Sequence, residues 1–329
     1  MRYIRDWIAV EADNLLSEWE AIDAILYDEA LEAEKPEPEE VLTSKDSPIT
    51  VKMVGEKGNN KTTASIFDRI KQFFDNLLIS IDRFFNEIAV KFQENFMNDK
   101  KFLKALNEFR KNHTVKADVN VQNGTYDSAY LDKTIATTTR FITNYTNVTK
   151  SIWNDLHNQI MSNTADKDTV ANTSEKIKQL FGNLTPTVYL ARSLGISVES
   201  SSNVHYMYNE IHSKFIGETK VINIGSNGDL SYVRNAEHYL KIYSSEYAEL
   251  NRTITSIKGA TDDMKRKIRQ ITNASRSQYN TANVLSQRVA EYCKAGQAVV
   301  SILRLCATCY IEKAINSRMI LQRAYGFQA

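Results

Sequence analysis

A run of large apolar residues at helical spacing constrains the fold more than any other part of the chain. Within residues 65–96, aromatic and aliphatic side chains recur in steps of three and four, and charged residues fill the positions between them. This pattern predicts one amphipathic helix about 48 Å long, since an α-helix rises 1.5 Å per residue. Its apolar stripe consists of Ile66, Phe67, Ile70, Phe73, Phe74, Leu77, Leu78, Ile81, Phe84, Phe85, Ile88, Phe92 and Phe96.

Such a stripe either packs against the rest of the protein or a partner, or lies on a membrane surface. Interfacial helices favour Lys and Arg on their polar face. The polar face of residues 65–96 carries charges of both signs, so packing is the favoured interpretation.

Most of the remaining chain is also predicted to be helical, at about residues 128–161, 166–183, 185–194 and 202–214. Alternating apolar residues in 115–126 and 219–233 predict short strands, and Asn123-Gly124 is typical of a tight turn. The predicted fold class is therefore mainly α. Long amphipathic helices form a bundle-like body with a few short β-strands or one small sheet.

The C-terminal third is predicted to form two long helices. The first covers about residues 230–258 and ends at Gly259, and Thr261 caps a second that runs from Asp262 to about Ala324. Long neighbouring helices joined by a short turn pack antiparallel. The sequence thus predicts a long C-terminal helical hairpin over residues 230–325.

Charge is distributed very unevenly along the chain. Residues 1–40 contain 3 Lys/Arg and 13 Asp/Glu, a net charge of −10, whereas the rest contains 38 and 27, a net charge of +11. We therefore divide the chain into an acidic helical leader (1–34), a flexible linker (35–63) and a mainly helical body (64–329). Such asymmetry is typical of proteins that contact a polyanion, or of an appendage that masks a surface which does so.

Much of the positive excess lies near the C-terminal end. Residues 264–329 contain 11 Lys/Arg and 2 Asp/Glu. This basic face either contacts the phosphates of a nucleic acid or is simply solvated. The candidate phosphate contacts are Lys265, Arg266, Lys267, Arg269, Arg276 and Arg288.

The motifs of metal, redox and catalytic sites give no further signal. Cys306 and Cys309 form a C-x-x-C, but a zinc site needs two more ligands and a thioredoxin-like site needs a βαβ unit. In a helical segment, cysteines three apart share one face, which favours a buried apolar seam over a metal or redox role. We expect no metal and no cofactor. Without a phosphate loop, a nucleophile elbow or an H-E-x-x-H pair, the sequence does not predict an enzyme.

The N-terminal organisation resembles the internal head proteins of large tailed bacteriophages. The resemblance covers about residues 1–100, and rests on the acidic leader, the Pro/Glu linker and the Phe-rich segment IFDRIKQFFDNLLISIDRFF. It implies that the leader is a propeptide, which a prohead protease removes by cutting after glutamate in short small-or-apolar-x-Glu contexts. The matching candidate cleavage sites follow Glu11, Glu18 and Glu32.

The resemblance also implies a function and partners. We expect a non-enzymatic virion structural protein, present in the host cytoplasm during assembly and packaged inside the capsid near DNA. The expected partners are other virion proteins, double-stranded DNA bound non-specifically, the prohead protease and further copies of the chain. The alternatives are a permanent acidic tail in place of a propeptide, a membrane-active helical protein delivered into a cell, and an uncharacterised enzyme.

Overall fold

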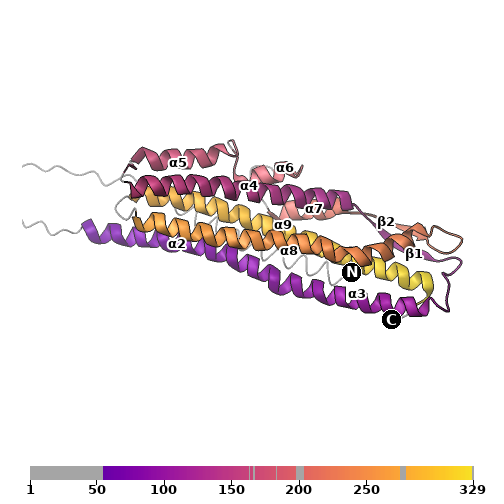
Figure 1. The fold of residues 1–329 in the computed structure, drawn as a ribbon. Helices are drawn as coiled ribbons and strands as arrows, with labels where there is room; N and C mark the ends of the chain where they lie inside the picture. Colours follow the sequence, from indigo (N-terminus) through magenta and orange to yellow (C-terminus); the bar gives the residue numbers. More distant parts are fainter. Residues whose placement is uncertain are drawn as a thin grey trace, which may run out of the picture. The chain divides into compact units, whose positions relative to one another are not determined.

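The computed structural model describes residues 55–327, apart from residues 163, 166, 183, 198–203 and 275–278. The predicted leader and residues 35–54 of the predicted linker lie outside this part. The mainly α class with one small sheet is confirmed (Figure 1). The described elements are α2 (Gly55–Arg83), the π-helix η1 (Phe84–Ala89), α3 (Val90–Phe109), β1 (Asn120–Tyr126), α4 (Ser128–Met161), α5 (Lys167–Gln179), α6 (Pro186–Ser193), α7 (Val204–Phe215), β2 (Ile216–Asn223), α8 (Ser231–Ala274) and α9 (Tyr279–Tyr325).

The Phe-rich stripe is helical and buried, as predicted. Its helix is interrupted by a π-helical turn at 84–89 and continues to Phe109. The steps of four from Phe84 to Ile88 to Phe92 exceed the 3.6 residues of an α-helical turn, so a wider turn keeps these side chains on one face. The packing interpretation is confirmed, because the following stripe residues are buried: Ile70, Phe73, Phe74, Leu77, Ile81, Phe84, Ile88 and Phe92.

The predicted end of the linker at residue 63 is wrong, because α2 already begins at Gly55. Residues 55–63 (GEKGNNKTT) are rich in Gly, Asn and Thr, which are weak helix formers. Extending an existing helix by one residue is far easier than starting one. The strongly periodic segment that follows therefore carries the helix back through a stretch that local propensity alone would leave irregular.

The small sheet pairs two segments that are distant in sequence. β1 runs antiparallel to β2, with Val121 opposite Ile222 and Gly124 opposite Thr219. Asn123-Gly124 therefore lies inside a strand, and the predicted tight turn there is wrong. The second apolar run of 219–233 is not a strand either. It begins α8, where the Asp229 carboxylate accepts the backbone N–H of Ser231 at 2.7 Å.

The predicted C-terminal hairpin forms, but the break between its helices is displaced. α8 passes through Gly259 without interruption, and Thr261 does not cap a helix but donates its hydroxyl to the Ile257 carbonyl at 2.8 Å. The two helices run antiparallel, since Tyr239 near the start of α8 donates to the carbonyl of Tyr310 in the second half of α9. One glycine costs a helix only about 1 kcal/mol, which the packing of a 44-residue helix outweighs.

The chain forms two compact units. The first comprises the described parts of residues 1–76, 147–186 and 262–294, and the second comprises 77–146, 187–261 and 295–329. The helices α2, α4, α8 and α9 each contribute a segment to both units.

The centre of the second unit is α9. Every residue from Ala295 to Ile311 is buried, so this segment has no solvent-facing side. A glycine allows one of its closest packing contacts, because a Cβ built on Gly296 would lie 2.8 Å from Leu77 Cδ2 of α2. Two of its hydroxyl side chains bond to their own helix: those of Ser301 and Thr308 donate to the carbonyls four residues earlier.

Two helical glycines provide a matched test of this packing. Gly259→Ala fills open space, so it raises the free energy of unfolding by about 0.5–1 kcal/mol through helix propensity alone. Gly296→Ala makes the same change against Leu77, where overpacking costs about 1–3 kcal/mol and outweighs that gain. Urea unfolding of both variants measures the difference. Equal stabilisation by both substitutions would contradict the close packing of α9 on α2.

Candidate functional site

Two of the predicted phosphate contacts on α8, Lys265 and Arg266, take part in local ion pairs within the first unit. Lys265 Nζ lies 2.6 Å from an Asp75 oxygen, and Arg266 pairs with Asp263. Asp263 also accepts from Lys150 at 3.2 Å, and these two cations lower the pKa of its carboxyl group. Nearby acids therefore offset part of the positive charge at this place.

The six candidates differ in exposure. Arg266 and Arg269 are exposed, Lys265 and Lys267 are half-buried, and Arg276 lies outside the described residues. Arg288 does not belong to a basic face, which corrects its assignment. Its side chain is only 6% exposed and donates to Glu291 at 2.6 Å. A guanidinium held in this way cannot reach a phosphate in solution.

Three more cations of α9 are used inside the second unit. Arg304, whose side chain is 4% exposed, pairs with Glu87 of η1. Arg318 Nε lies 2.9 Å from Asp99 of α3. Lys313 donates to the Ser128 hydroxyl at 2.5 Å. The basic composition of residues 264–329 therefore does not translate into a basic surface of equal strength.

Asp99 is the centre of the most deeply buried of these contacts. It is fully buried, accepts the Tyr243 hydroxyl at 2.7 Å, and faces Arg318 on its other oxygen. Burial raises the pKa of the Asp99 carboxyl above its usual value, and this effect outweighs the Tyr243 hydrogen bond and the charge of Arg318, which both lower it. The contact joins α3, α8 and α9 at one point.

This raised pKa predicts how stability changes with pH. Between the ordinary pKa of about 3.9 in the unfolded chain and the higher folded value, the folded chain binds more protons. Stability from this group is therefore lost as pH rises through that window. The free energy of unfolding of the protein minus that of Asp99→Asn should fall from pH 4 upward, by at most about 1.4 kcal/mol per pH unit within that window.

Urea unfolding across pH 4–7 measures this difference. Asp155→Asn, which removes an exposed carboxylate of α4, is the control and should show no comparable trend. A difference that grows with pH would mean that Arg318 and Tyr243 favour the charged form of Asp99 more strongly than burial disfavours it.

Lys313 of α9 forms a second set of polar contacts inside the second unit. Its ammonium lies 4.1 Å from the centre of the Tyr239 ring and donates to Ser128 at the start of α4. Burial lowers the pKa of Lys313, and the carboxylates of Glu246 and Asp132 partly restore it. Burial in turn raises the pKa values of these two acids. The arrangement compensates one half-buried cation with a ring, a hydroxyl and nearby acids.

The C-x-x-C motif lies in the core, as predicted. Cys306 and Cys309 are fully buried on α9, and both are free thiols. Burial raises the pKa of each thiol above its ordinary value, and the same holds for Cys293. Since the thiolate is the reactive form, these cysteines are held in an unreactive state.

A thiol reagent tests this burial directly. The folded protein should react with dithionitrobenzoate far more slowly than a free cysteine does. The urea-unfolded chain should release three equivalents of thionitrobenzoate, one for each of its three cysteines. One thiol that reacts rapidly in the folded protein would show that this part of α9 opens.

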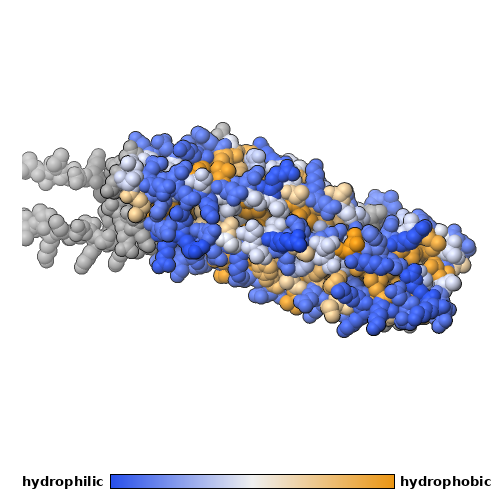
Figure 2. Space-filling model, in the orientation of Figure 1, coloured by the Kyte–Doolittle hydropathy of each residue, from blue (hydrophilic) through white to orange (hydrophobic). Residues whose placement is uncertain are grey.

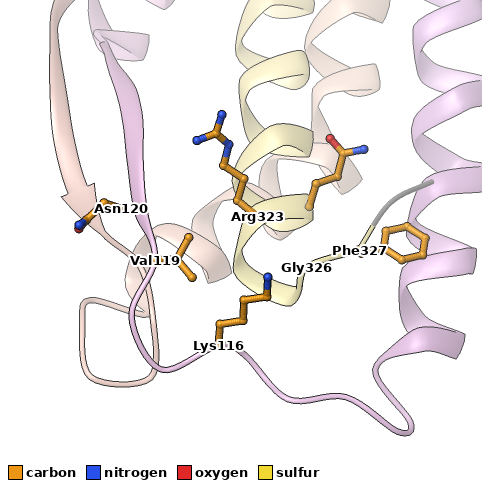
Figure 3. Close-up of a pocket in the computed structure, with 7 residues that line it drawn as sticks. Lys116, Val119, Asn120, Arg323, Gly326 and Phe327 are labelled. Carbon is orange, nitrogen blue, oxygen red and sulfur yellow. The ribbon is translucent and has the colours of Figure 1, made fainter.

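An open groove beside the end of α9 is a site that the sequence did not indicate. It has a volume of about 490 Å³ and lies within the second unit. Figure 3 shows Lys116 extending toward Gly326, and Arg323 extending from α9 toward the strand side of the groove. The groove is lined by Lys116, Val119, Asn120, Gln322, Arg323, Gly326 and Phe327.

Both walls of this groove are fixed by backbone hydrogen bonds. The N–H of Lys116 donates to the Ala324 carbonyl at 2.9 Å, and the Lys116 carbonyl accepts the N–H of Ser226 at 2.8 Å. Gly326 ends α9 at a φ of +66°, a left-handed conformation that suits glycine. Its N–H and that of Phe327 donate to the carbonyls of Arg323 and Gln322 at 3.3 and 2.9 Å.

Both cations of the groove are exposed. Among the described residues, neither Lys116 nor Arg323 forms an ion pair. In this they differ from the cations of Arg288, Arg304 and Arg318. Lys116 and Arg323 are far apart in the sequence, and no motif of the sequence joins them.

The candidate cleavage sites after Glu11, Glu18 and Glu32 lie outside the described residues. Among the residues that the structure describes, no group of His, Cys, Asp or Glu side chains is arranged to hold a metal ion. None of the helices in the same residues combines the length and apolar character that a bilayer crossing requires. Comparisons with family models, with curated proteins and with solved structures found no match to this chain.

Proposed function

We propose that this chain is a non-enzymatic virion structural protein of a tailed phage, packaged near DNA, whose acidic leader limits contact with DNA until it is removed. The separation of charge carries the proposal: a net charge of −10 in residues 1–40 precedes a net charge of +11 in the rest. The proposal rests further on the resemblance of residues 1–100 to internal head proteins. Cleavage after Glu32 would remove nine of the 13 acidic side chains of residues 1–40 in one step.

The surface of the body is suited to weak, non-specific contact with a polyanion. The face in Figure 2 is mostly hydrophilic, with small separate apolar areas. Exposed lysines occur on α3 and on α5 as well as on α8. Because DNA attracts any exposed cation, phosphate binding of this kind needs no single shaped site. Examples of exposed cations are Lys100, Lys101, Lys104, Lys176, Lys178, Arg266 and Arg269.

The placement of the Phe-rich stripe favours this function over membrane activity. Phe73, Phe74 and Phe84 are fully buried. A helix that binds a membrane through its apolar face must release that face from the core. Such release would expose the stripe residues on which the packing of α9 depends.

DNA binding by the whole chain and by a chain that begins at Ala33 tests the proposal. Residues 1–32 contain two Lys/Arg and nine Asp/Glu, so truncation raises the net charge from +1 to +8. We expect the truncated chain to bind two unrelated duplexes more tightly than the whole chain, and with equal affinity for both. Its affinity should fall steeply with salt, because each neutralised phosphate releases counterions. Fluorescence anisotropy at several salt concentrations measures both effects.

A second variant separates the charge of the leader from its bulk. Replacing the nine Asp/Glu of residues 1–32 with Asn or Gln keeps the leader and raises the net charge to +10. If charge masks the body, this variant should bind at least as tightly as the truncated chain. Absence of binding by both variants at low salt would exclude the proposed contact with DNA.

A further inference from the structure

We propose that the groove between Lys116 and Arg323 binds a phosphate group carried by a small phosphate ester or by a nucleic-acid backbone. This goes beyond the proposed function, because a single defined site for one anion is not needed for non-specific contact with DNA. Its geometry rests on residues of the second unit alone.

The charge of the groove is the first argument. Lys116 and Arg323 are exposed cations on the same lining, whereas the other arginines of α9 have acidic partners in Glu291, Glu87 and Asp99. Arginine offers a planar fork of donors and lysine a compact charge, a combination suited to an oxyanion. The side-chain amides of Asn120 and Gln322 add further donors to the lining.

Fixed positions are the second argument. Lys116 belongs to a segment held on both sides, by Ala324 through its N–H and by Ser226 through its carbonyl. Ala117 is held in the same way, because its carbonyl accepts the N–H of Asn227 at 3.0 Å. Arg323 lies in the last turn of α9, which Gly326 and Phe327 close. Because the backbone at both cations is fixed, mainly their side-chain rotamers remain to be ordered when a ligand binds.

The size of the groove limits the class of ligand that it can bind. A volume of about 490 Å³ falls within the range of small-molecule sites, roughly 300–1,000 Å³, and exceeds what a bare phosphate ion fills. Val119 and Phe327 provide apolar lining beside the cations. A phosphate ester, with an organic portion next to the anion, therefore suits the groove better than the free ion does.

The same two cations could instead serve only the helix end. Positive side chains near a helix C-terminus stabilise its partial negative charge. However, three carbonyls of the last turn, those of Gln322, Arg323 and Ala324, already accept backbone N–H groups. That role predicts a loss of stability, without any binding of phosphate, when the cations are removed.

Binding of inorganic phosphate to the whole protein distinguishes these roles. Equilibrium dialysis against radiolabelled phosphate, at constant ionic strength in chloride, measures its affinity for the protein. We expect the double variant Lys116→Gln/Arg323→Gln to bind phosphate at least about tenfold more weakly, because each substitution removes one charge-assisted hydrogen bond to the anion. Circular dichroism checks that the variant is folded.

The matched control removes the same charge elsewhere. Lys133→Gln/Arg140→Gln changes two exposed cations of α4 and should leave phosphate affinity within about twofold of the unmodified protein. An equal loss in both double variants, or undiminished binding in the groove variant, would overturn the proposal. Loss of stability without any phosphate binding by the unmodified protein would also overturn it, and would assign the cations to the helix end.

A short oligonucleotide, with and without a 5′-terminal phosphate, identifies the source of the group. Groove-dependent binding of both forms would assign the site to the backbone diester, and groove-dependent binding of the phosphorylated form alone would assign it to a terminal phosphate ester. Binding of inorganic phosphate without DNA binding by the truncated chain would support the groove while excluding the proposed function. DNA binding by the truncated chain that the groove substitutions leave unchanged, together with no binding of inorganic phosphate, would support the proposed function and exclude the groove as a phosphate site.

Discussion

The burial of residues 295–311 of α9 on all sides is the constraint on which the second unit depends. A helical segment with no solvent-facing side must find partners for its charged side chains within the protein, because an unpaired buried charge costs several kcal/mol. Between Ala295 and Arg318 the helix carries two arginines, and each meets a carboxylate from a different element. Glu87 of the π-helical turn and Asp99 of α3 are therefore structural partners of α9, and they fix where the Phe-rich helix lies along it.

This constraint changes the meaning of the charge in the C-terminal region. Net composition suggested a basic face for contact with a polyanion, but Arg288, Arg304 and Arg318 use their charge internally. Among the described residues, the cations that remain at the surface are of two kinds: dispersed lysines and arginines suited to weak contact, and the pair Lys116 and Arg323 in a defined groove. An acidic leader can mask only such exposed cations, because the buried ones already have partners within the fold.

Features with strong local periodicity could be predicted from the sequence, and features that depend on distant partners could not. The Phe-rich helix and α4 follow from apolar spacing alone. The continuity of α8 through Gly259 could not, because packing along the whole helix outweighs one weak residue. The pairing of β1 with β2 joins segments separated by four helices, so the local pattern Asn123-Gly124 predicts a turn where the structure has a strand.

The candidate site shows the same limit. Lys265, Arg266, Lys267 and Arg269 form an obvious cluster in the sequence, yet the structure supplies Asp75 and Asp263 as neighbours. Lys116 and Arg323 are far apart in sequence and belong to no motif. Only the backbone contacts of Lys116 with Ala324 and Ser226 bring them to one groove. Side chains that serve one site from two distant segments leave no pattern at helical or strand spacing.

A double-mutant cycle on Arg304 and Glu87 tests most directly whether α9 is held by internal ion pairs. The free energies of unfolding of Arg304→Met, Glu87→Gln and the double variant are compared with that of the unmodified protein. If the buried guanidinium depends on this carboxylate, the double variant should be more stable than the sum of the single effects implies, with a coupling energy of about 1–3 kcal/mol. Additive effects within about 0.5 kcal/mol would show that Arg304 does not need Glu87, and would contradict the account of α9 as a helix whose cations are neutralised inside the fold.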